Sequence, residues 1–281
     1  MDTFNKVKKF FLSKAYLFKH PLYAVTCVVI YFLKDFRIRV HFYSDTEIIN
    51  LLQKGKSIVR LGDGDIINIQ LGMQNIYHRD DVRLRNMYAE IIKTYTNDSE
   101  YILSIPRFVT MDSNELASLG EGKLTWGVRM KAMVFLQFNK QCSYMDAHSF
   151  YYDDYFTTVV APTLNNKKII CLTNRRIIED LSANNAIPWK DIFYIESPES
   201  NAMDAYRTIL NQLDEELKKH DRKDVIILSG MGPVGKYIIF KYAKLGYQGI
   251  DVGRGLEVVY KNESLEDLYP ELKITKSKGS R

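Results

Sequence analysis

Short apolar runs alternate along most of the chain with longer segments in which apolar residues recur every three or four positions. The apolar runs have the length of strands and lie at 57–61, 101–105, 168–172, 192–195, 224–228 and 249–252. Segments of helical period lie beside them, at 80–95, 126–138, 203–219 and 233–245. Strands that alternate with helices in this way predict an α/β fold, a mainly parallel Rossmann-like sheet with helices on both faces.

The limits of this regular pattern divide the chain into three parts. Ser44 and Glu47 have the spacing of a capping box, which predicts a helix that begins here and stops at Gly55. We therefore expect an α/β domain over 44–270, preceded by a basic and aromatic helical segment, 1–43. Residues 271–281 are polar and basic, and we expect them to form a flexible tail.

The N-terminal segment combines lysine with aromatic and apolar residues. Five lysines lie between positions 6 and 19, interleaved with Phe, Tyr, Leu and Val, and an apolar run from Leu22 to Leu33 follows. This run of about 12 residues is shorter than the roughly 20 that a membrane-spanning helix needs. Basic residues beside aromatic ones suit a helix on an anionic membrane surface, so residues 1–40 are a candidate for peripheral membrane contact. A helical hairpin that packs on the protein body, or on a second subunit of a homo-oligomer, explains the same pattern equally well.

The run that begins at Ser57 breaks into a turn that carries two carboxylates. Its sequence is Arg60-Leu-Gly62-Asp63-Gly64-Asp65. Glycine allows backbone angles that other residues resist, so the turn can fold tightly and bring Asp63 and Asp65 toward one point, with Arg60 behind them. Two such carboxylates repel each other unless a cation lies between them, which predicts a site for Mg²⁺ or Mn²⁺ completed by substrate phosphates. Capping of the next helix by either aspartate is the alternative.

A second glycine turn follows the strand at 224–228 and opens a helix. Gly230, Gly232 and Gly235 have the spacing of the dinucleotide fingerprint, and Pro233 suits a first helical position. Free N–H groups at a helix start attract the phosphates of any nucleotide. The turn therefore indicates a nucleotide phosphate site. An NAD site, with Asp251 as the acid that binds the ribose, and a merely tight turn remain alternatives.

Other polar residues follow strands at the expected carboxyl edge of the sheet, where ligands bind in such folds. Arg175 suits a diphosphate, although a surface ion pair explains it as well. Ser200 and Asn201 are candidates to hold a base or ribose, or to cap a helix. Glu257 follows the last strand and is the candidate general base.

Composition narrows the range of functions. A hydrophobic content of 46% and a charged content of 26% are ordinary for a soluble globular protein. The net charge of +5 is spread along the chain, so it gives no reason to expect nucleic-acid binding. The three cysteines are far apart and form neither a disulfide framework nor a zinc spacing, which fits a reducing cytoplasm.

Taken together, these stretches resemble the bacterial GT-D-type glycosyltransferases. The family's Arg-x-Gly-Asp-Gly-Glu stretch is similar to 60–65, with Asp65 in place of the final Glu, and its Pro-Ser-x-Asn-Ala-like stretch is similar to 197–202. The most specific likeness is the ending, at 228–233, 243–248 and 251–253, where a Gly-Pro turn, Ala-Lys-Leu-Gly-Tyr-Gln and Asp-x-Gly follow one another. After Asp-x-Gly the family often continues with His and acidic residues, whereas this chain has Arg-Gly-Leu-Glu. The resemblance covers about 45–262.

This resemblance implies a metal-dependent glycosyltransferase that takes a sugar from a nucleotide sugar, which we expect to be UDP-linked. Asp63 and Asp65 would hold the divalent metal, and Asp65 would also be a catalytic residue. Arg60, Gly62, Arg175, Gly230, Gly232, Pro233, Ser200, Asn201 and Asp251 would bind substrate. The acceptor would be a glycan, a lipid-linked glycan or a glycoprotein of the bacterial surface, reached from the cytoplasm or from the inner face of the cell membrane.

Two other functions remain open on the sequence. A nucleotide-binding oxidoreductase would use the turn from Gly230 to Gly235 and would bind NAD without a metal. A non-catalytic membrane-associated scaffold would depend on residues 1–40 and not on Asp63 or Asp65.

Overall fold

The computed structural model describes residues 20–69, 71–72, 78–151, 154–183 and 191–256 of the 281-residue chain. The predicted N-terminal segment up to residue 19, the predicted tail and Glu257 lie outside the described residues. The described elements run from a helix at Pro21–Phe32 to a strand at Gln248–Asp251.

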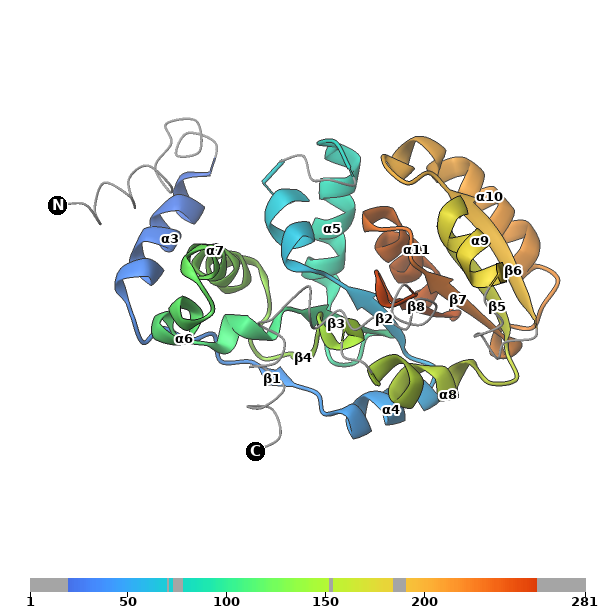
Figure 1. The fold of residues 1–281 in the computed structure, drawn as a ribbon, viewed down its shortest axis with the longest axis horizontal. Helices are drawn as coiled ribbons and strands as arrows, with labels where there is room; N and C mark the ends of the chain where they lie inside the picture. The colour runs from blue at the N-terminus through green and yellow to red at the C-terminus, as the bar shows by residue number, and fades with distance from the viewer. Residues whose placement is uncertain (1–19, 70, 73–77, 152–153, 184–190, 257–281) are drawn as a thin grey trace.

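A single eight-stranded sheet runs through the middle of the described molecule (Figure 1). Every pair of neighbouring strands in it is parallel. The order is β1-β4-β3-β2-β8-β7-β5-β6, so β2 and β8 meet at the centre. The strands are β1 (His41–Phe42), β2 (Ser57–Arg60), β3 (Tyr101–Ile105), β4 (Ser143–Asp146), β5 (Lys168–Asn174), β6 (Ile192–Ser197), β7 (Val225–Ser229) and β8 (Gln248–Asp251).

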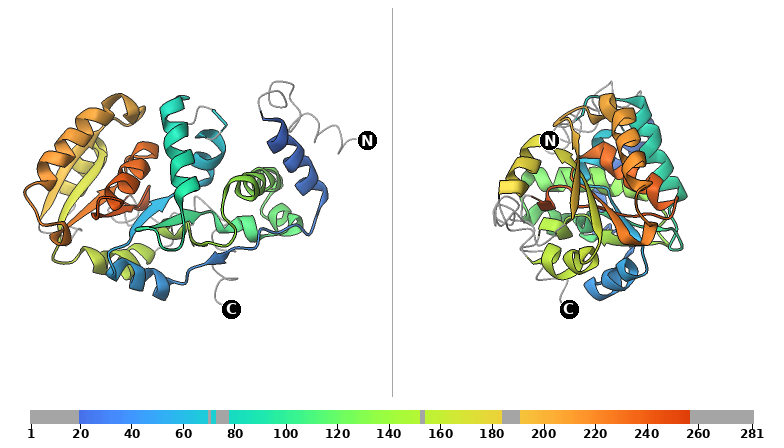
Figure 2. Two further views of the ribbon diagram at one scale, coloured as in Figure 1. Left: turned by 180° about the vertical axis from the view of Figure 1, so that it is seen from behind. Right: turned by 90° about the vertical axis from the view of Figure 1, so that its right-hand side faces the viewer.

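Helices cover both faces of this sheet, as the sequence predicts (Figures 1 and 2). One face packs against α5 (Val82–Thr94), α7 (Glu121–Gln137), α10 (Tyr206–Leu217) and α11 (Pro233–Ala243). The other packs against α4 (Asp45–Gln53), α8 (Ala161–Leu164) and α9 (Arg175–Ala183). The short helix α6 (Ser113–Ser118) lies beside α7.

The two layers of core follow from the alternation of side chains along a strand. In β5, Ile169 and Cys171 belong to the core under α4, α8 and α9. Ile170 and Leu172 belong to the core under α5, α10 and α11. Because the side chains on both faces of the strand are buried, its sequence is a continuous apolar run. Such runs are typical of a parallel sheet covered on both faces.

The predicted elements agree closely with those observed. The capping box is confirmed, since the Ser44 side chain accepts from Glu47 N and the Glu47 side chain accepts from Ser44 N before α4. The predicted strand at 101–105 is β3. The helix predicted at 126–138 begins earlier, because α7 starts at Glu121. Sequence reasoning missed β1 and β4, which are short and mixed in polarity.

The apolar run after Pro21 forms α3 (Pro21–Phe32), and one face of it packs on the body of the protein. Tyr23, Cys27 and Ile30 are buried in the core cluster that also contains α7. The sequence left open whether this run contacts a membrane or packs on the protein. This face of the helix packs on the protein. Among the described residues, no helix has the length and hydropathy needed to cross a membrane.

A buried lysine joins α7 to the segment that leads from α3 to β1. Lys131 is fully buried, and its Nζ donates a 2.8 Å hydrogen bond to the carbonyl oxygen of Phe36. Burial is the main reason that the pKa of Lys131 is lowered to about 8, and the positive charge of Arg37 lowers it further. The negative charges of Asp112 and Glu115 oppose this change. The folded protein therefore releases this proton at a lower pH than the unfolded chain does.

This difference predicts a stability that depends on pH. Between the folded pKa and the ordinary value of 10.5, the unfolded chain holds a proton that the folded protein has lost, so the free energy of unfolding rises with pH. Relative to Lys131→Met, the wild type should gain about 2 kcal/mol between about pH 7 and pH 9.5 in denaturant unfolding. The exposed Lys93→Met is the control, and a gap between wild type and Lys131→Met that stays constant with pH would contradict this account.

Candidate active site

The carboxylate turn lies at the centre of the sheet's carboxyl edge, because it follows β2. The chain turns directly into helical structure there: Ile66 N donates to Gly62 O at 3.0 Å, and a π-helical turn covers Asp65–Ile69. The Asp65 carboxylate folds back, since its Oδ2 accepts from Gly62 N at 3.0 Å. Asp65 thus caps the turn and also faces the edge of the sheet.

Gly62 has an ordinary backbone conformation and close neighbours. The sequence led us to expect that Gly62 adopts backbone angles that other residues resist. Its φ lies outside the left-handed region, so this expectation does not hold for Gly62. A Cβ at this position would lie 3.3 Å from Asp65 Oδ2 and 3.6 Å from Arg60 Nη1. A side chain at Gly62 would therefore press on the Asp65 carboxylate, while its distance to Arg60 would be an ordinary contact.

Two cations and two carboxylates form a buried cluster at this point. Lys236 Nζ lies 3.3 Å from Asp65 Oδ2 and 3.6 Å from Asp251 Oδ2. Arg60 Nε lies 3.5 Å from the same Asp251 oxygen. Lys236 and Asp251 are 2% and 0% exposed, so each needs the others to remain charged inside the protein.

The charges in this cluster influence one another. Burial raises the pKa of Asp251 above its usual range, while Lys236 and Arg60 oppose the rise and Asp65 adds to it. Burial also raises the pKa of Tyr88, and the charges of Asp65 and Asp251 raise it further. Tyr88 therefore stays a neutral hydroxyl, and it donates to Pro233 O at 3.2 Å.

Arg60 is fixed on several sides. Its Nη1 donates to Ala147 O and to Tyr151 Oη, both at 3.3 Å. Gly253 has a φ of 52°, and a Cβ there would lie 2.0 Å from Arg60 Nη2, so only glycine leaves room for the guanidinium. Tyr151 belongs to the aromatic and acidic segment 146–155, whose Phe150 and Tyr155 are buried. This part of the segment therefore packs inward.

Asp63 faces a different element from Asp65. Its Oδ2 accepts from Trp126 Nε1 of α7 at 2.5 Å, and its Oδ1 accepts from Gly64 N at 2.9 Å. The two carboxylates of the turn are thus held by α7 on one side and by Lys236 of α11 on the other. Sequence reasoning gave Trp126 only as the start of a predicted helix and missed its contact with Asp63.

The two aspartates are the residues that could hold a hard divalent cation. Among the described residues each Asp63 oxygen accepts one hydrogen bond, and a carboxylate oxygen has a second lone pair that a metal could use. Within the described part of the chain, no group of three or more His, Cys, Asp and Glu side chains could hold a metal. A metal at this turn would have two protein carboxylates and complete its shell with water and substrate oxygens, a common arrangement for Mg²⁺.

The second glycine turn leads directly into the charged cluster. Gly232 has a φ of 74° and caps α11, and Pro233 occupies the first helical turn, as predicted. A Cβ at Gly230 would lie 2.9 Å from Leu256 and 3.4 Å from Thr173 Oγ1, so the turn packs closely on its neighbours. One turn into the helix, Lys236 joins Asp65 and Asp251.

Three buried hydroxyls line the ends of the neighbouring strands. Thr173, Ser197 and Ser229 lie at the carboxyl ends of β5, β6 and β7, and within the described residues their oxygens have no hydrogen-bond partner. Buried polar atoms are almost always paired with protein, water or a ligand. This row of hydroxyls marks the edge of the sheet beside the cluster as polar and incompletely satisfied.

The remaining predicted residues lie farther out. Arg175 begins α9 and pairs with Glu196 at 3.0 Å, with 72% of its side chain exposed, which is the predicted surface ion pair. Ser200 is exposed. Asn201 has a left-handed φ of 54°, and its Oδ1 accepts from Arg79 N at 2.9 Å, so it joins two loops.

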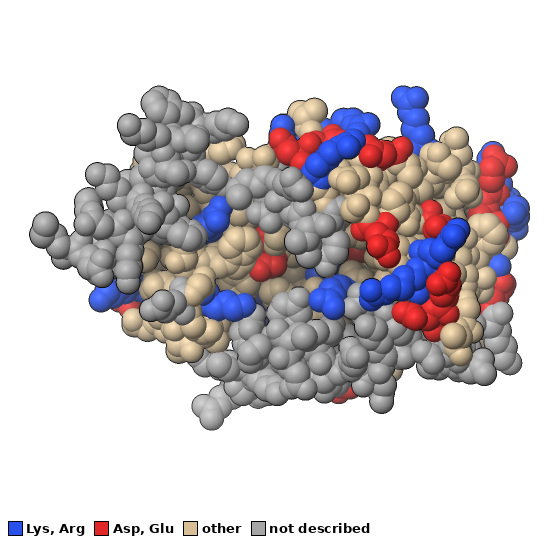
Figure 3. Space-filling view, turned by 45° about the horizontal axis from the view of Figure 1, so that its top comes forward, with Lys and Arg blue, Asp and Glu red and all other residues tan. Residues whose placement is uncertain are grey.

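Acidic and basic side chains of the described residues lie close together on the face that Figure 3 shows. They occur at its right-hand end and also in its recessed middle. A surface of mixed sign offers separate places for a polyanionic group and for a cation.

A family model described as the glycosyltransferase GT-D fold matches residues 58–261. The chain belongs to this GT-D family and is a glycosyltransferase. The match includes the carboxylate turn, the glycine turn and β8, and thus all four members of the buried cluster.

Solved structures share this fold. A structure described as a new glycosyltransferase (DUF1792) from Streptococcus sanguinis has 18% identity and a TM-score of 0.61, over 80% of this chain and 86% of that chain. Another, described as a domain of unknown function 1792 with a distinct glycosyltransferase fold, has 17% identity and a TM-score of 0.65, over 85% and 84%. Among curated proteins, none matches this sequence.

Sequence reasoning about this GT-D protein missed Lys236, although a signal was present. Gly230, Gly235 and Lys236 have the Gly-x-x-x-x-Gly-Lys spacing of a phosphate-binding loop, with Tyr237 in place of its usual Ser or Thr. The spacing places a lysine directly after the last glycine, near the start of the helix, which is where the structure has it. Tyr151 had no comparable signal, because its contact with Arg60 depends on the packing of a distant loop.

Because Arg60 packs directly against Gly253, we expect a methyl group at position 253 to destabilise the protein more than one at another glycine. Gly253→Ala should push the guanidinium away from Asp251 and leave a buried charge unpaired, which costs about 3 kcal/mol. Gly55→Ala is the matched control, since Gly55 has a φ of 84° and open space around it, so only backbone strain of about 1 kcal/mol is expected. Equal losses in thermal or denaturant unfolding would show that Arg60 does not depend on this space.

Proposed function

We propose that this glycosyltransferase transfers a sugar from a UDP-linked donor with the help of a divalent metal, Mn²⁺ or Mg²⁺. The observation that carries the proposal is the pair Asp63 and Asp65 in the turn after the central strand β2. Asp65 Oδ2 lies 3.3 Å from the buried Lys236 Nζ, and Arg60, also buried, ends the same strand. Carboxylates for a metal and cations for phosphates are both needed by a reaction whose leaving group is a nucleoside diphosphate.

The buried cations would stabilise negative charge on the leaving group. Arg60 and Lys236 are fixed before any ligand arrives, because Tyr151 Oη, Ala147 O, Asp65 and Asp251 already hold them. Charged groups fixed in a region of low dielectric stabilise developing charge without first having to reorganise. The N–H groups at the start of α11 would add to this positive potential.

The unsatisfied hydroxyls support a place for the nucleotide on the same edge. Thr173 and Ser229 lie on β5 and β7, between the charged cluster and the exposed pair of Arg175 and Glu196. A ligand that brings oxygen and nitrogen atoms to this edge would pair them. Ser200 and Asn201 remain the proposed contacts for base or ribose at its outer end.

A metal on Asp63 and Asp65 would supply Lewis-acid stabilisation of the diphosphate. If the reaction inverts the sugar, a carboxylate of the chain must accept the proton of the acceptor hydroxyl. We propose Glu257 for this role, since it follows β8 by a few residues in the sequence. Glu257 itself lies outside the described part of the chain. Asp65 would bind the metal and orient it toward the donor.

The acceptor is proposed to be a glycan, a lipid-linked glycan or a glycoprotein of the bacterial surface. The enzyme would act in the cytoplasm, at the inner face of the cell membrane, with residues 1–40 as the point of contact. The basic and aromatic sequence of this segment supports the location. Membership of a glycosyltransferase family decides against the oxidoreductase and the non-catalytic scaffold.

The proposal predicts that activity depends on the metal and on the carboxylates. Release of UDP from a panel of UDP-sugars, measured with a mixture of surface-glycan acceptors and Mn²⁺, should stop when EDTA is added and return with excess Mn²⁺. Asp63→Ala and Asp65→Asn should each lower the rate by about 100-fold or more. Asp65→Glu restores the family's longer carboxylate and should remain within about tenfold of the wild type.

Asp98→Asn is the control, because Asp98 is exposed and far from the turn in sequence. All variants should keep a cooperative thermal transition, so that loss of activity is separated from loss of folding. An Asp63→Ala protein with the full wild-type rate, or a rate unaffected by EDTA, would end the metal proposal.

A further inference from the structure

The outer face of α3 is apolar, although it lies on the surface. The large apolar residues exposed on this helix and at its end are Leu22, Val25, Val29, Phe32 and Leu33, each between 50% and 67% exposed. They follow one another at helical spacing, opposite the face formed by Tyr23, Cys27 and Ile30 that packs on the protein. A helix of a soluble protein normally places polar residues on its outer side, and α3 has no charged residue on either side.

The apolar face continues beyond the helix. Phe135 of α7 is 42% exposed and makes an edge-to-face contact with Phe36, with ring centres 5.9 Å apart. Lys140 lies over the Phe135 ring at 4.7 Å and donates to Phe135 O at 2.9 Å. Six of the nine large apolar residues that are exposed in the described part of the chain thus belong to this end of the molecule.

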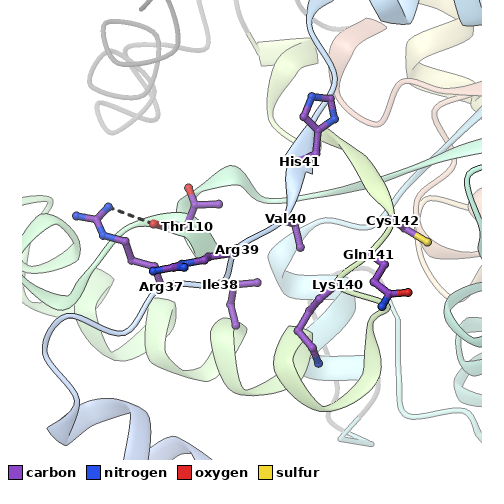
Figure 4. A pocket seen from close by; sticks show the side chains of 9 residues that line it. All are labelled: Arg37, Ile38, Arg39, Val40, His41, Thr110, Lys140, Gln141 and Cys142. Carbon is purple, nitrogen blue, oxygen red and sulfur yellow. Dashed lines mark hydrogen bonds between the residues drawn. The ribbon is translucent and has the colours of Figure 1, made fainter.

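A basic recess adjoins this apolar face. It has a volume of about 520 Å³ and is formed by the segment 37–41 that leads out of α3, by Thr110, and by the turn before β4 (Figure 4). Arg37, Arg39, His41 and Lys140 line it, and no acidic residue is among its lining residues in the described chain. Asp112 and Glu115 pair with Arg37 from one side, while Arg39 and Lys140 keep the recess positive.

We propose that this end of the molecule is a membrane-docking surface, in which the outer face of α3 enters the headgroup layer and the recess binds the phosphate of an anionic phospholipid. Apolar side chains beside basic ones are the two components of interfacial binding. A negatively charged bilayer complements Arg39 and Lys140, whereas a second copy of this chain would bring the same positive recess against itself.

The sequence before α3 points to the same partner. Residues 1–19 contain five lysines and a single acidic residue, Asp2, and they lead directly into the apolar helix. Each basic residue near an anionic surface strengthens attraction to it, and stable attachment generally needs both charge and buried apolar area. The exposed face of α3 supplies the apolar part that lysines alone lack.

The inference deepens the membrane location proposed above, and its test does not use transferase activity. The full chain is sedimented with vesicles of phosphatidylcholine alone and with vesicles that also contain phosphatidylglycerol. Wild type should bind the anionic vesicles and bind the neutral ones at least tenfold more weakly. A triple variant, Leu22→Ser with Val29→Ser and Phe32→Ser, should lose at least tenfold in binding to the anionic vesicles.

Matched controls separate this surface from general effects. Val82→Ser with Phe193→Ser and Leu245→Ser removes three exposed apolar residues elsewhere and should bind as wild type does. Arg39→Gln with Lys140→Gln should weaken binding to anionic vesicles by at least fivefold, whereas the exposed pair Lys54→Gln with Lys93→Gln should not. Light scattering reports the mass of each variant in solution.

Three results would overturn the proposal. Wild-type binding by the α3 triple variant would assign membrane contact to another segment. If wild type and the Arg39→Gln, Lys140→Gln variant each bind neutral and anionic vesicles equally well, the recess has no role in binding. A wild-type dimer that the triple variant dissociates, with no vesicle binding, would identify a second copy as the occupant. Continued UDP release in each of these cases would leave the proposed reaction intact.

Discussion

A buried set of charges at the middle of the sheet is the constraint on which the candidate site depends. Lys236 and Asp251 are almost completely removed from water, and their partners are Arg60 and Asp65. The loss of hydration makes each ion expensive on its own, so the four must be placed together or not at all. Such a cluster adds little to stability compared with apolar packing. Its position at a ligand-binding edge is better explained by the chemistry that it allows.

The order of the strands is what brings these residues together. β2 comes from the first half of the chain and β8 from its end, yet they are neighbours at the centre of the sheet. Arg60 and Asp251 are the last residues of these two strands, and α11 returns between β7 and β8 to deliver Lys236. Gly253 then leaves the space that the guanidinium of Arg60 requires. A site assembled from segments almost 200 residues apart is thus set by topology and by one missing side chain.

The sequence was sufficient for the class of fold, because strand-length apolar runs and capping signals such as Ser44 and Glu47 are local. It also placed the carboxylate turn directly after a strand and the helix start at Pro233. It did not show that Asp63 faces Trp126 while Asp65 faces Lys236, since this depends on how α7 and α11 cross the edge of the sheet. Short edge elements such as β1 give no periodicity to read.

The two ends of the molecule suggest a division of tasks within one enzyme. The proposed diphosphate and metal site lies among the charges at the centre of the sheet, whereas the proposed membrane-docking surface is the apolar and basic end formed by α3. The measurement that tests the central claim most directly is calorimetric titration of UDP into the intact chain, with Mn²⁺ present and after its removal by EDTA. The account predicts binding of UDP that requires Mn²⁺, much weaker binding of uridine, and no binding of NAD. Metal-independent binding of UDP, or binding of NAD in its place, would contradict it.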